Sequence, residues 1–316
     1  MKALVTATSL FKPVNRQAKA LADSFFDQLI PNDLGVPLRG EQILSRIEGC
    51  SAYITGVDWI TEDVIRQMPD TLKVISCYGV GTDRIDLEAA KQRGIAVTCT
   101  RGSNSIAVCE MAFGLMLALA RNIPQIHQRV SNGQWPRYQG IELSGKTLGI
   151  VGMGSIGKLL AVRARAFGMH VLACGHHPDM EFVKANGLIC TDFNTVLENS
   201  DFISLHVPMR PENYHMISRE SIARMKNGCI LINTARGDLV DEEAVAQALK
   251  SGKLGGLGAD TFQQEPIADS PLLGLDHVIL TSHIAAHTDI ALSNMGVLSV
   301  KNAIAILKGE SCPYRI

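Results

Sequence analysis

A glycine-rich hexapeptide, Gly152-Met153-Gly154-Ser155-Ile156-Gly157, stands between an apolar run at 148–151 and a helical pattern at 158–167. In this strand–turn–helix context, G-x-G-x-x-G is typical of a dinucleotide site. Gly152 permits the tight turn, Gly154 lets backbone N–H groups approach a pyrophosphate, and Gly157 lets the helix pack on the strand. The positive end of the helix dipole then faces the phosphates. The alternative is an ordinary glycine-rich turn between a strand and a helix.

The next predicted strand, residues 170–174, ends without the acid that such sites use to hold the adenosine ribose. About 20 residues after the glycine turn an Asp or Glu normally accepts a hydrogen bond from the 2′-hydroxyl. Here Gly175, His176 and His177 follow the strand. Without a carboxylate nothing repels a 2′-phosphate, and this favours NADP(H) over NAD(H). The alternative is that the two histidines form a solvated loop and that the selectivity is slight.

The composition describes a globular chain with no strong charge. The sequence has 316 residues, of which 46% are hydrophobic and 19% charged, with 30 Lys and Arg against 31 Asp and Glu. Disorder needs lower hydrophobicity and a higher net charge. The balance of charge gives no basic surface for nucleic acid or anionic membrane. The N-terminus lacks the apolar run of a signal peptide. We therefore expect a cytoplasmic protein with no nucleic-acid or membrane partner.

The eight cysteines indicate neither a disulfide framework nor a redox motif. None belongs to a C-x-x-C pair, and several lie within apolar runs, such as Cys109 and Cys229. Disulfide frameworks belong mainly to short secreted chains. We expect these residues to be small, reduced core side chains.

Strand-like and helix-like patterns alternate in two series, which is typical of parallel α/β sheets covered on both faces. The break between the series lies near residues 101–103, before a long apolar helix. The last helix, 289–307, follows the second series, and periodicity does not place it. The predicted strands are 2–7, 52–55, 72–76, 95–98, 147–151, 170–174, 202–207, 229–233, 256–259 and 277–280. The predicted helices are 15–29, 86–93, 104–120, 157–167, 218–225, 242–250 and 289–307.

Six segments occur in an order that is specific in combination. They are Tyr78-Gly79-Val80-Gly81-Thr82-Asp83-Arg84-Ile85-Asp86, residues 147–157, His206-Val207-Pro208, Asn233-Thr234-Ala235-Arg236-Gly237, residues 259–266 and Thr281-Ser282-His283-Ile284-Ala285-Ala286. With these segments the chain resembles the D-isomer-specific 2-hydroxyacid dehydrogenase family over nearly its whole length.

The resemblance implies a two-lobed α/β fold. A flavodoxin-like substrate lobe would comprise residues 1–101 and 288–316, and a Rossmann NAD(P)-binding lobe would comprise residues 102–287. The active site would lie in the cleft between the lobes. Family members are usually homodimers through the nucleotide lobe, with the long apolar helix contributing, and we expect the same here.

The resemblance also selects three residues for the reduction of a 2-oxo acid. Arg236 carries a planar, permanent charge suited to a carboxylate and a neighbouring carbonyl oxygen. His283 changes protonation near neutral pH, so it can give a proton in reduction and take one in oxidation. Glu265 would hydrogen-bond one ring nitrogen of His283, fix its tautomer and stabilise its charged form.

Further contacts follow from the same segments. Asp260 matches the position near the nicotinamide carboxamide, with a turn role as the alternative. The backbone amides of Val80 and Gly81 would bind the substrate carboxylate opposite Arg236.

His283 and His287 have an H-x-x-x-H spacing but no third ligand, so we expect no metal. The predicted cofactor contacts are Gly152, Gly154, Ser155, Ile156, Gly157, Gly175, His176, His177, His206, Val207, Pro208, Thr234, Ala235, Asp260 and His283. The predicted substrate contacts are Val80, Gly81, Arg236 and His283.

Specificity within the family stays open. Phosphoglycerate-type members often hold a phosphate with a basic residue after the strand near 52–54, where this chain has Thr55, Gly56, Val57 and Asp58. Asp58 would repel a phosphate if it faced the cleft. We also expect no regulatory domain after the last helix. Both observations favour hydroxypyruvate or glyoxylate, with D-3-phosphoglycerate dehydrogenase as the alternative.

Two other classes of protein are alternatives to a reductase of small 2-oxo acids. One is a non-catalytic dinucleotide-sensing scaffold similar to the corepressors that resemble this family, although the partner-binding extensions of those proteins are absent here. The other is oxidation of formate or phosphite on the same fold. Formate-oxidising relatives replace the glutamate that pairs with the histidine, so Glu265 argues against formate but not against phosphite.

Overall fold

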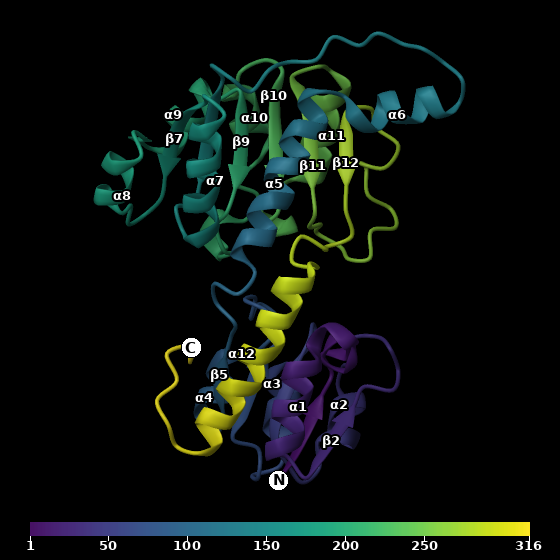
Figure 1. The fold of residues 1–316 in the computed structure, drawn as a ribbon, viewed down its shortest axis with the longest axis vertical. Coiled ribbons are helices and arrows are strands. Elements are labelled where there is room, and N and C mark those ends of the chain that lie inside the picture. Colours follow the sequence, from purple (N-terminus) through teal and green to yellow (C-terminus); the bar gives the residue numbers. More distant parts are fainter. The chain divides into compact units, whose positions relative to one another are not determined.

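A computed structural model describes all 316 residues and divides into two compact units. The first unit comprises Met1–Asn104 and His287–Ile316, and the second comprises Ser105–Ala286. Both units are α/β, with an entirely parallel sheet in each (Figure 1). The domain boundaries expected from the sequence, after residues 101 and 287, lie within three residues of these divisions.

The first unit has a five-stranded sheet in the order β2-β1-β3-β4-β5, the flavodoxin-like order. Its strands are β1 (Lys2–Val5), β2 (Gln28–Pro31), β3 (Cys50–Thr55), β4 (Val74–Cys77) and β5 (Ala96–Thr98). Its helices are α1 (Arg16–Phe25), α2 (Glu41–Ile47), α3 (Glu62–Gln67), α4 (Leu87–Gln92) and α12 (Asp289–Leu307), with short 3₁₀ turns η1 (Thr8–Phe11) and η2 (Pro13–Asn15).

Side chains of β1 alternate between two cores, as the period of a strand requires. Ala3 and Val5 join the cluster that contains Ala18 of α1 and Val300 of α12. Leu4 points to the opposite cluster, which contains Ile43 of α2. The sheet is therefore covered on both faces, with α1 and α12 on the same side.

The second unit has a seven-stranded sheet in the order β12-β11-β10-β9-β6-β7-β8, the Rossmann order with one further strand. Its strands are β6 (Thr147–Val151), β7 (His170–Cys174), β8 (Ile189–Cys190), β9 (Phe202–Leu205), β10 (Cys229–Asn233), β11 (Leu254–Ala259) and β12 (Val278–Leu280). Its helices are α5 (Ser105–Ala120), α6 (Ile123–Ser131), α7 (Ser155–Ala166), α8 (Met180–Ala185), α9 (Phe193–Asn199), α10 (Arg219–Arg224) and α11 (Glu242–Lys250), with 3₁₀ turns η3 (Pro211–Asn213) and η4 (Gly237–Leu239).

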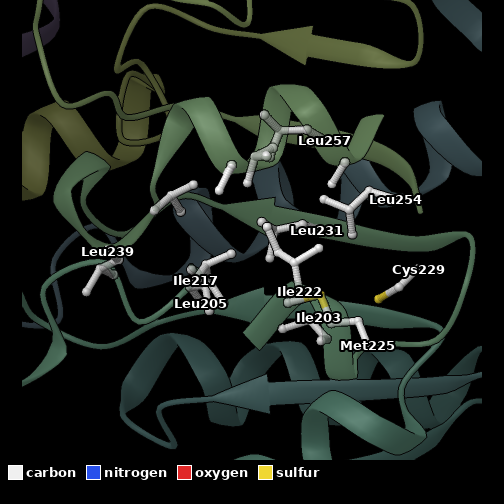
Figure 2. Packing of buried hydrophobic residues seen from close by; sticks show 14 of the residues in the cluster. Ile203, Leu205, Ile217, Ile222, Met225, Cys229, Leu231, Leu239, Leu254 and Leu257 are labelled. Carbon is white, nitrogen blue, oxygen red and sulfur yellow. The ribbon is translucent and has the colours of Figure 1, made fainter. Parts of the chain in front are cut away.

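The central strand β10 is buried on both faces, as its continuous apolar sequence predicts. Cys229 and Leu231 belong to the core beneath α9, α10 and α11 (Figure 2). Ile230 and Ile232 belong to the opposite core with α5 and α7. Alternate residues of one apolar run therefore build two separate cores.

Several elements differ from the sequence prediction. The helix expected over 15–29 ends at Phe25, and Gln28–Pro31 form edge strand β2 paired with β1. Backbone pairing with β1 replaces local helix preference there, and Pro31 is tolerated because it ends an edge strand. Helices α2, α3, α6 and α8–α9 and the short strand β8 were not predicted, because their apolar residues are too few for a clear period.

Helix α12, which periodicity could not place, packs on α1 and across β3 and β4 of the first unit. Helix α12, and the bent pair α5–α6 taken together, are long and apolar enough to cross a membrane by length and composition alone. Val300 and Ala303 of α12 are fully buried in the core of the first unit. The apolar character of α12 is thus used in packing against its own sheet.

The eight cysteines are all unpaired, and five of them are buried. Burial raises the pKa of Cys77 and that of Cys229 to about 12, so both thiols stay protonated at neutral pH. These residues act as small apolar side chains.

Candidate active site

The glycine turn joins β6 to α7 and is shaped by close backbone contacts. Gly152 has φ +105°, and a Cβ there would lie 2.4 Å from the carbonyl oxygen of His206. A Cβ on Gly157 would lie 2.1 Å from the carbonyl oxygen of Gly152. Gly154 faces open space, with no atom within 4 Å of a Cβ. Gly152 and Gly157 are thus required because a side chain would collide with the protein's own backbone, whereas the open space at Gly154 leaves room for a ligand.

Three strand ends meet at this turn. The Gly152 N–H donates to the Cys174 carbonyl at the end of β7 over 2.8 Å, and the His206 N–H donates to the Val151 carbonyl over 2.7 Å. Gly175 follows directly, and a Cβ there would lie 3.6 Å from the Met153 nitrogen. His176 and His177 are exposed in the loop before α8. The structure therefore brings the predicted nucleotide residues to one edge of the sheet.

Two buried polar atoms at this edge have no partner within the chain. His206 shares a hydrogen bond of 2.8 Å between its Nε2 and Ser204 Oγ, but its Nδ1 is buried without a partner. The hydroxyl of Thr234, which follows β10, is buried and unpartnered as well. Buried polar groups normally have partners. Their position beyond the carboxyl ends of β9 and β10 fits a bound dinucleotide.

Arg236 lies on a loop whose backbone is held by the side-chain amide of Asn233. Asn233 ends β10; its Oδ1 accepts from the Ala235 N–H over 3.1 Å, and its Nδ2 donates to the Arg236 carbonyl over 2.8 Å. A Cβ on Gly237 would lie 1.9 Å from the carbonyl carbon of Phe262. The loop therefore packs backbone to backbone against the segment that leads to Glu265. Our sequence prediction missed Asn233, although a buried amide closing an apolar strand was its signal.

Glu265 and His283 form the predicted pair. The Nδ1 of His283 lies 2.9 Å from Oε2 and 3.1 Å from Oε1 of Glu265. Glu265 Oε1 also accepts from the Phe262 N–H over 3.1 Å. The His283 side chain is 48% exposed, whereas that of Glu265 is 23% exposed. A carboxylate beside Nδ1 favours the tautomer that carries its proton there, and Glu265 makes no contact with Nε2.

Asp260 anchors the loop that carries His283. Its side chain is 1% exposed. Its Oδ1 accepts from the Thr281 hydroxyl over 2.6 Å and from the Ile284 N–H over 2.9 Å, and its Oδ2 accepts from the Ala285 N–H over 2.8 Å. His283 itself has φ +55°, a left-handed conformation that is uncommon outside glycine. The Asp260 carboxylate therefore positions His283, while its contact with the nicotinamide carboxamide stays a prediction.

Val80 and Gly81 lie in the first unit, in the exposed loop after β4. Neither backbone N–H donates to another backbone group. Asp58 of the same unit is 3% exposed, and its carboxylate accepts from Thr6, Tyr53 and Thr55 hydroxyls and from the Leu38 N–H. Its charge is thus directed into the protein. Asp58 is therefore not turned outward to repel a phosphate, and it does not count against a phosphorylated substrate.

No group of three or more His, Cys, Asp and Glu side chains is arranged to hold a metal ion. His283 is engaged with Glu265, and His287 belongs to the other unit.

The protein thus has two α/β units. The second unit carries a glycine turn typical of dinucleotide binding at the carboxyl edge of its sheet, and the Glu265–His283 pair. Residues 113–285 match the model of the D-isomer specific 2-hydroxyacid dehydrogenase family, NAD binding domain. The chain belongs to this family.

Individual relatives differ in length. Glyoxylate reductase of Thermococcus litoralis is 40% identical over 303 residues, which cover 93% of this chain and 91% of that protein. D-3-phosphoglycerate dehydrogenase of Methanocaldococcus jannaschii is 41% identical over 283 residues, 88% of this chain but 54% of that protein. The chain thus spans about half of the length of that relative.

A solved structure agrees with the fold. D-lactate dehydrogenase from Aquifex aeolicus, complexed with NAD and lactic acid, has a TM-score of 0.85 and 31% identity, covering 98% of this chain and 96% of that one.

The first prediction concerns His206. Burial lowers the pKa of His206 to about 4, below the value of about 6.5 of an unfolded histidine. As the pH falls from about 6.5 to about 4, the unfolded chain gains a proton that the folded chain does not, so stability is lost. We expect the urea midpoint of the cofactor-free protein to fall over this window, and to fall less in His206→Gln. Equal pH dependence in both proteins would contradict this assignment.

Proposed function

We propose that this protein is an NAD(P)H-dependent reductase of small 2-oxo acids, with glyoxylate and hydroxypyruvate as the favoured substrates. The observation that carries the proposal is the His283–Glu265 pair, held 2.9 Å apart on a loop that Asp260 anchors. The neighbouring loop carries Arg236. Family membership and the similarity to glyoxylate reductases support the choice of substrate.

Each residue has a distinct part in the chemistry. When bound, the nicotinamide cofactor supplies the hydride that reduces C2 of the acid. His283 donates the proton from Nε2 to the carbonyl oxygen, and Glu265 stabilises the imidazolium that gives it. Arg236 binds the carboxylate and the oxygen on which negative charge develops. In the first unit, the amides of Val80 and Gly81 offer hydrogen-bond donors suited to a carboxylate.

NADP(H) is the proposed cofactor rather than NAD(H). Gly175 takes the place of the acid at the end of β7, and His176 and His177 beside it are exposed. A Cβ at Gly175 would be in ordinary contact distance of Met153, so the absence of a side chain there is not a steric requirement. We interpret this glycine as a specificity feature, because an acid would fit.

Initial rates with NADPH and NADH, each with glyoxylate, hydroxypyruvate and 3-phosphohydroxypyruvate, test function and cofactor together. We expect turnover of the first two acids with NADPH preferred. In Gly175→Asp we expect kcat/KM for NADPH to fall about tenfold or more and that for NADH to rise, because a carboxylate repels the 2′-phosphate and accepts from the 2′-hydroxyl.

Gly175→Asn is the matched control, since it adds nearly the same volume without charge. Equal effects of Asp and Asn would contradict the electrostatic explanation. Preference for NADH in the unmodified protein would contradict the cofactor proposal, and preference for the phosphorylated acid would favour a D-3-phosphoglycerate dehydrogenase. Cofactor binding without turnover of any acid would favour a sensing scaffold.

A second substitution tests the acid–base pair. In Glu265→Gln we expect kcat/KM for reduction to fall about 10²-fold or more, and its pH profile to move to lower pH, because the imidazolium loses a negative neighbour. Glu242→Gln is the control, and we expect it to leave the pH profile unchanged. The Glu242 carboxylate is also buried and accepts hydrogen bonds from the Gln263 N–H over 2.9 Å and from the Ser270 hydroxyl, but it does not contact His283. An unchanged pH profile in Glu265→Gln would remove Glu265 from this role.

We propose a homodimer through the second unit. Helix α6 and the segment after it reach away from the sheet of this unit (Figure 1). Large apolar side chains are exposed there: Ile123 (54%), Val130, Trp135 (80%), Tyr138 and Ile141. Such a group of exposed apolar residues is typical of an interface. A second copy of the chain is the occupant that the family resemblance favours.

Light scattering coupled to size-exclusion chromatography measures the molar mass in solution and so tests the proposed dimer. We expect a dimer, and a shift toward monomer in Ile123→Glu/Trp135→Glu. Ile290→Glu is the control, since Ile290 is equally exposed (68%) but lies on α12 of the first unit. A monomeric unmodified protein, or dissociation by Ile290→Glu alone, would contradict this interface.

A further inference from the structure

The phenol of Tyr78 is the centre of a partly buried chain of hydrogen bonds in the first unit. Asn15 Nδ2 donates to the Tyr78 oxygen over 2.8 Å and to the Ser9 carbonyl over 2.8 Å. Tyr78 in turn donates to the Leu292 carbonyl over 2.6 Å. Burial raises the pKa of Tyr78, so the phenol keeps the proton that it donates. This chain ties together η1, the loop after β4 and the beginning of α12.

The anchored tyrosine lies directly before the amides proposed to bind the substrate carboxylate. The Tyr78 N–H donates to the Thr55 carbonyl and the Gly79 carbonyl accepts from the Thr100 N–H, both over 2.8 Å. Gly79 has φ +151°, which favours glycine. Residues 78 and 79 are therefore held from both sides, whereas the next two N–H groups, of Val80 and Gly81, have no backbone acceptor. Backbone hydrogen bonds therefore hold the loop as far as Gly79, directly before two N–H groups that have no backbone acceptor.

Asn15 is poorly explained as a stabilising residue. It is fully buried, and its Oδ1 has no partner. A Cβ on Gly296 would lie 2.0 Å from this oxygen, so α12 passes against it closely. A buried, unsatisfied carbonyl oxygen reduces stability. An apolar side chain would fill the space without that cost, which indicates that the two donated hydrogen bonds matter for geometry.

We propose that Asn15 and Tyr78 are positioning residues that hold the Val80–Gly81 amides in a fixed place relative to η1, and thereby set the affinity for the 2-oxo acid. The inference rests on the proposed function, because that function assigns the carboxylate to these amides. Proton donation and charge stabilisation are assigned to His283 and Arg236, on separate loops. Loss of the network should therefore raise KM while changing kcat little.

Tyr78→Phe tests this directly, because it removes the phenol oxygen and keeps the ring. We expect KM for glyoxylate and hydroxypyruvate to rise about tenfold, because both hydrogen bonds of the phenol oxygen are lost, with kcat within twofold. Asn15→Leu should have the same effect on KM. Hydrogen exchange of the 78–82 amides should accelerate in both variants.

Ser76→Ala is the matched control. The Ser76 hydroxyl also donates to a carbonyl of α12, that of Ser299, over 2.7 Å, and it is buried in the same unit. Its loss should lower thermal stability to a similar extent while leaving KM and the exchange of residues 78–82 unchanged. A KM increase in Ser76→Ala equal to that in Tyr78→Phe would mean that α12 merely loosened, and would overturn the proposal.

The exchange measurement separates this inference from the proposed function. If the unmodified protein reduces no 2-oxo acid, the proposed function fails, yet faster exchange in Tyr78→Phe but not in Ser76→Ala still supports the positioning of the loop. If the protein is active and neither KM nor exchange changes in Tyr78→Phe, the network has no positioning role and the inference is wrong.

Discussion

The candidate active site depends on one buried carboxylate. Asp260 is almost fully buried, and an unpaired charge in that position would be strongly destabilising. It is compensated by the Thr281 hydroxyl and by the Ile284 and Ala285 N–H groups, all from one loop. Satisfying the charge therefore fixes the path of the chain on both sides of His283. The left-handed backbone of His283 and its approach to Glu265 follow from this constraint.

Close contact between backbones places the other strand ends. Gly152 lies against His206, Gly157 against Gly152, and Gly237 against Phe262, each so closely that a methyl group would collide with main-chain atoms. Side chains would hold these loops apart. Glycine allows the ends of β6, β9 and β10 and the Glu265 loop to meet, and the unpartnered atoms of His206 and Thr234 lie at the edge that results.

The first unit uses polar groups differently. Asp58 accepts hydrogen bonds from β3 and from two loops, and Tyr78 links Asn15 of η2 to α12. These networks lie beneath the loops at the carboxyl ends of the strands, where ligands bind in parallel sheets. Hydrogen bonds beneath an exposed loop hold its backbone in one place, which is what orienting a small ligand requires.

Local sequence determined much of this protein. Alternating apolar runs predicted the parallel sheets, since strands buried on both faces need continuous hydrophobic residues. The glycine turn between β6 and α7 and the missing acid at Gly175 were both visible in the sequence. The pairing of Glu265 with His283, 18 residues apart, came from the order of six motifs and could not follow from spacing alone.

Tertiary structure decided the rest. The 28–31 segment became a strand because β1 offered it a backbone partner, which no local pattern records. The place of α12 depended on α1 and on a sheet whose Ser76 lies 223 residues before its partner Ser299. Asp58 looked like a free charge and is a buried acceptor, and Asp260 was predicted only from its match to a cofactor position and proves to anchor a loop as well. The contacts of Asn15 and Tyr78 could not be predicted from the sequence. A polar residue's function depends on which donors and acceptors surround it, and only folding brings those groups together.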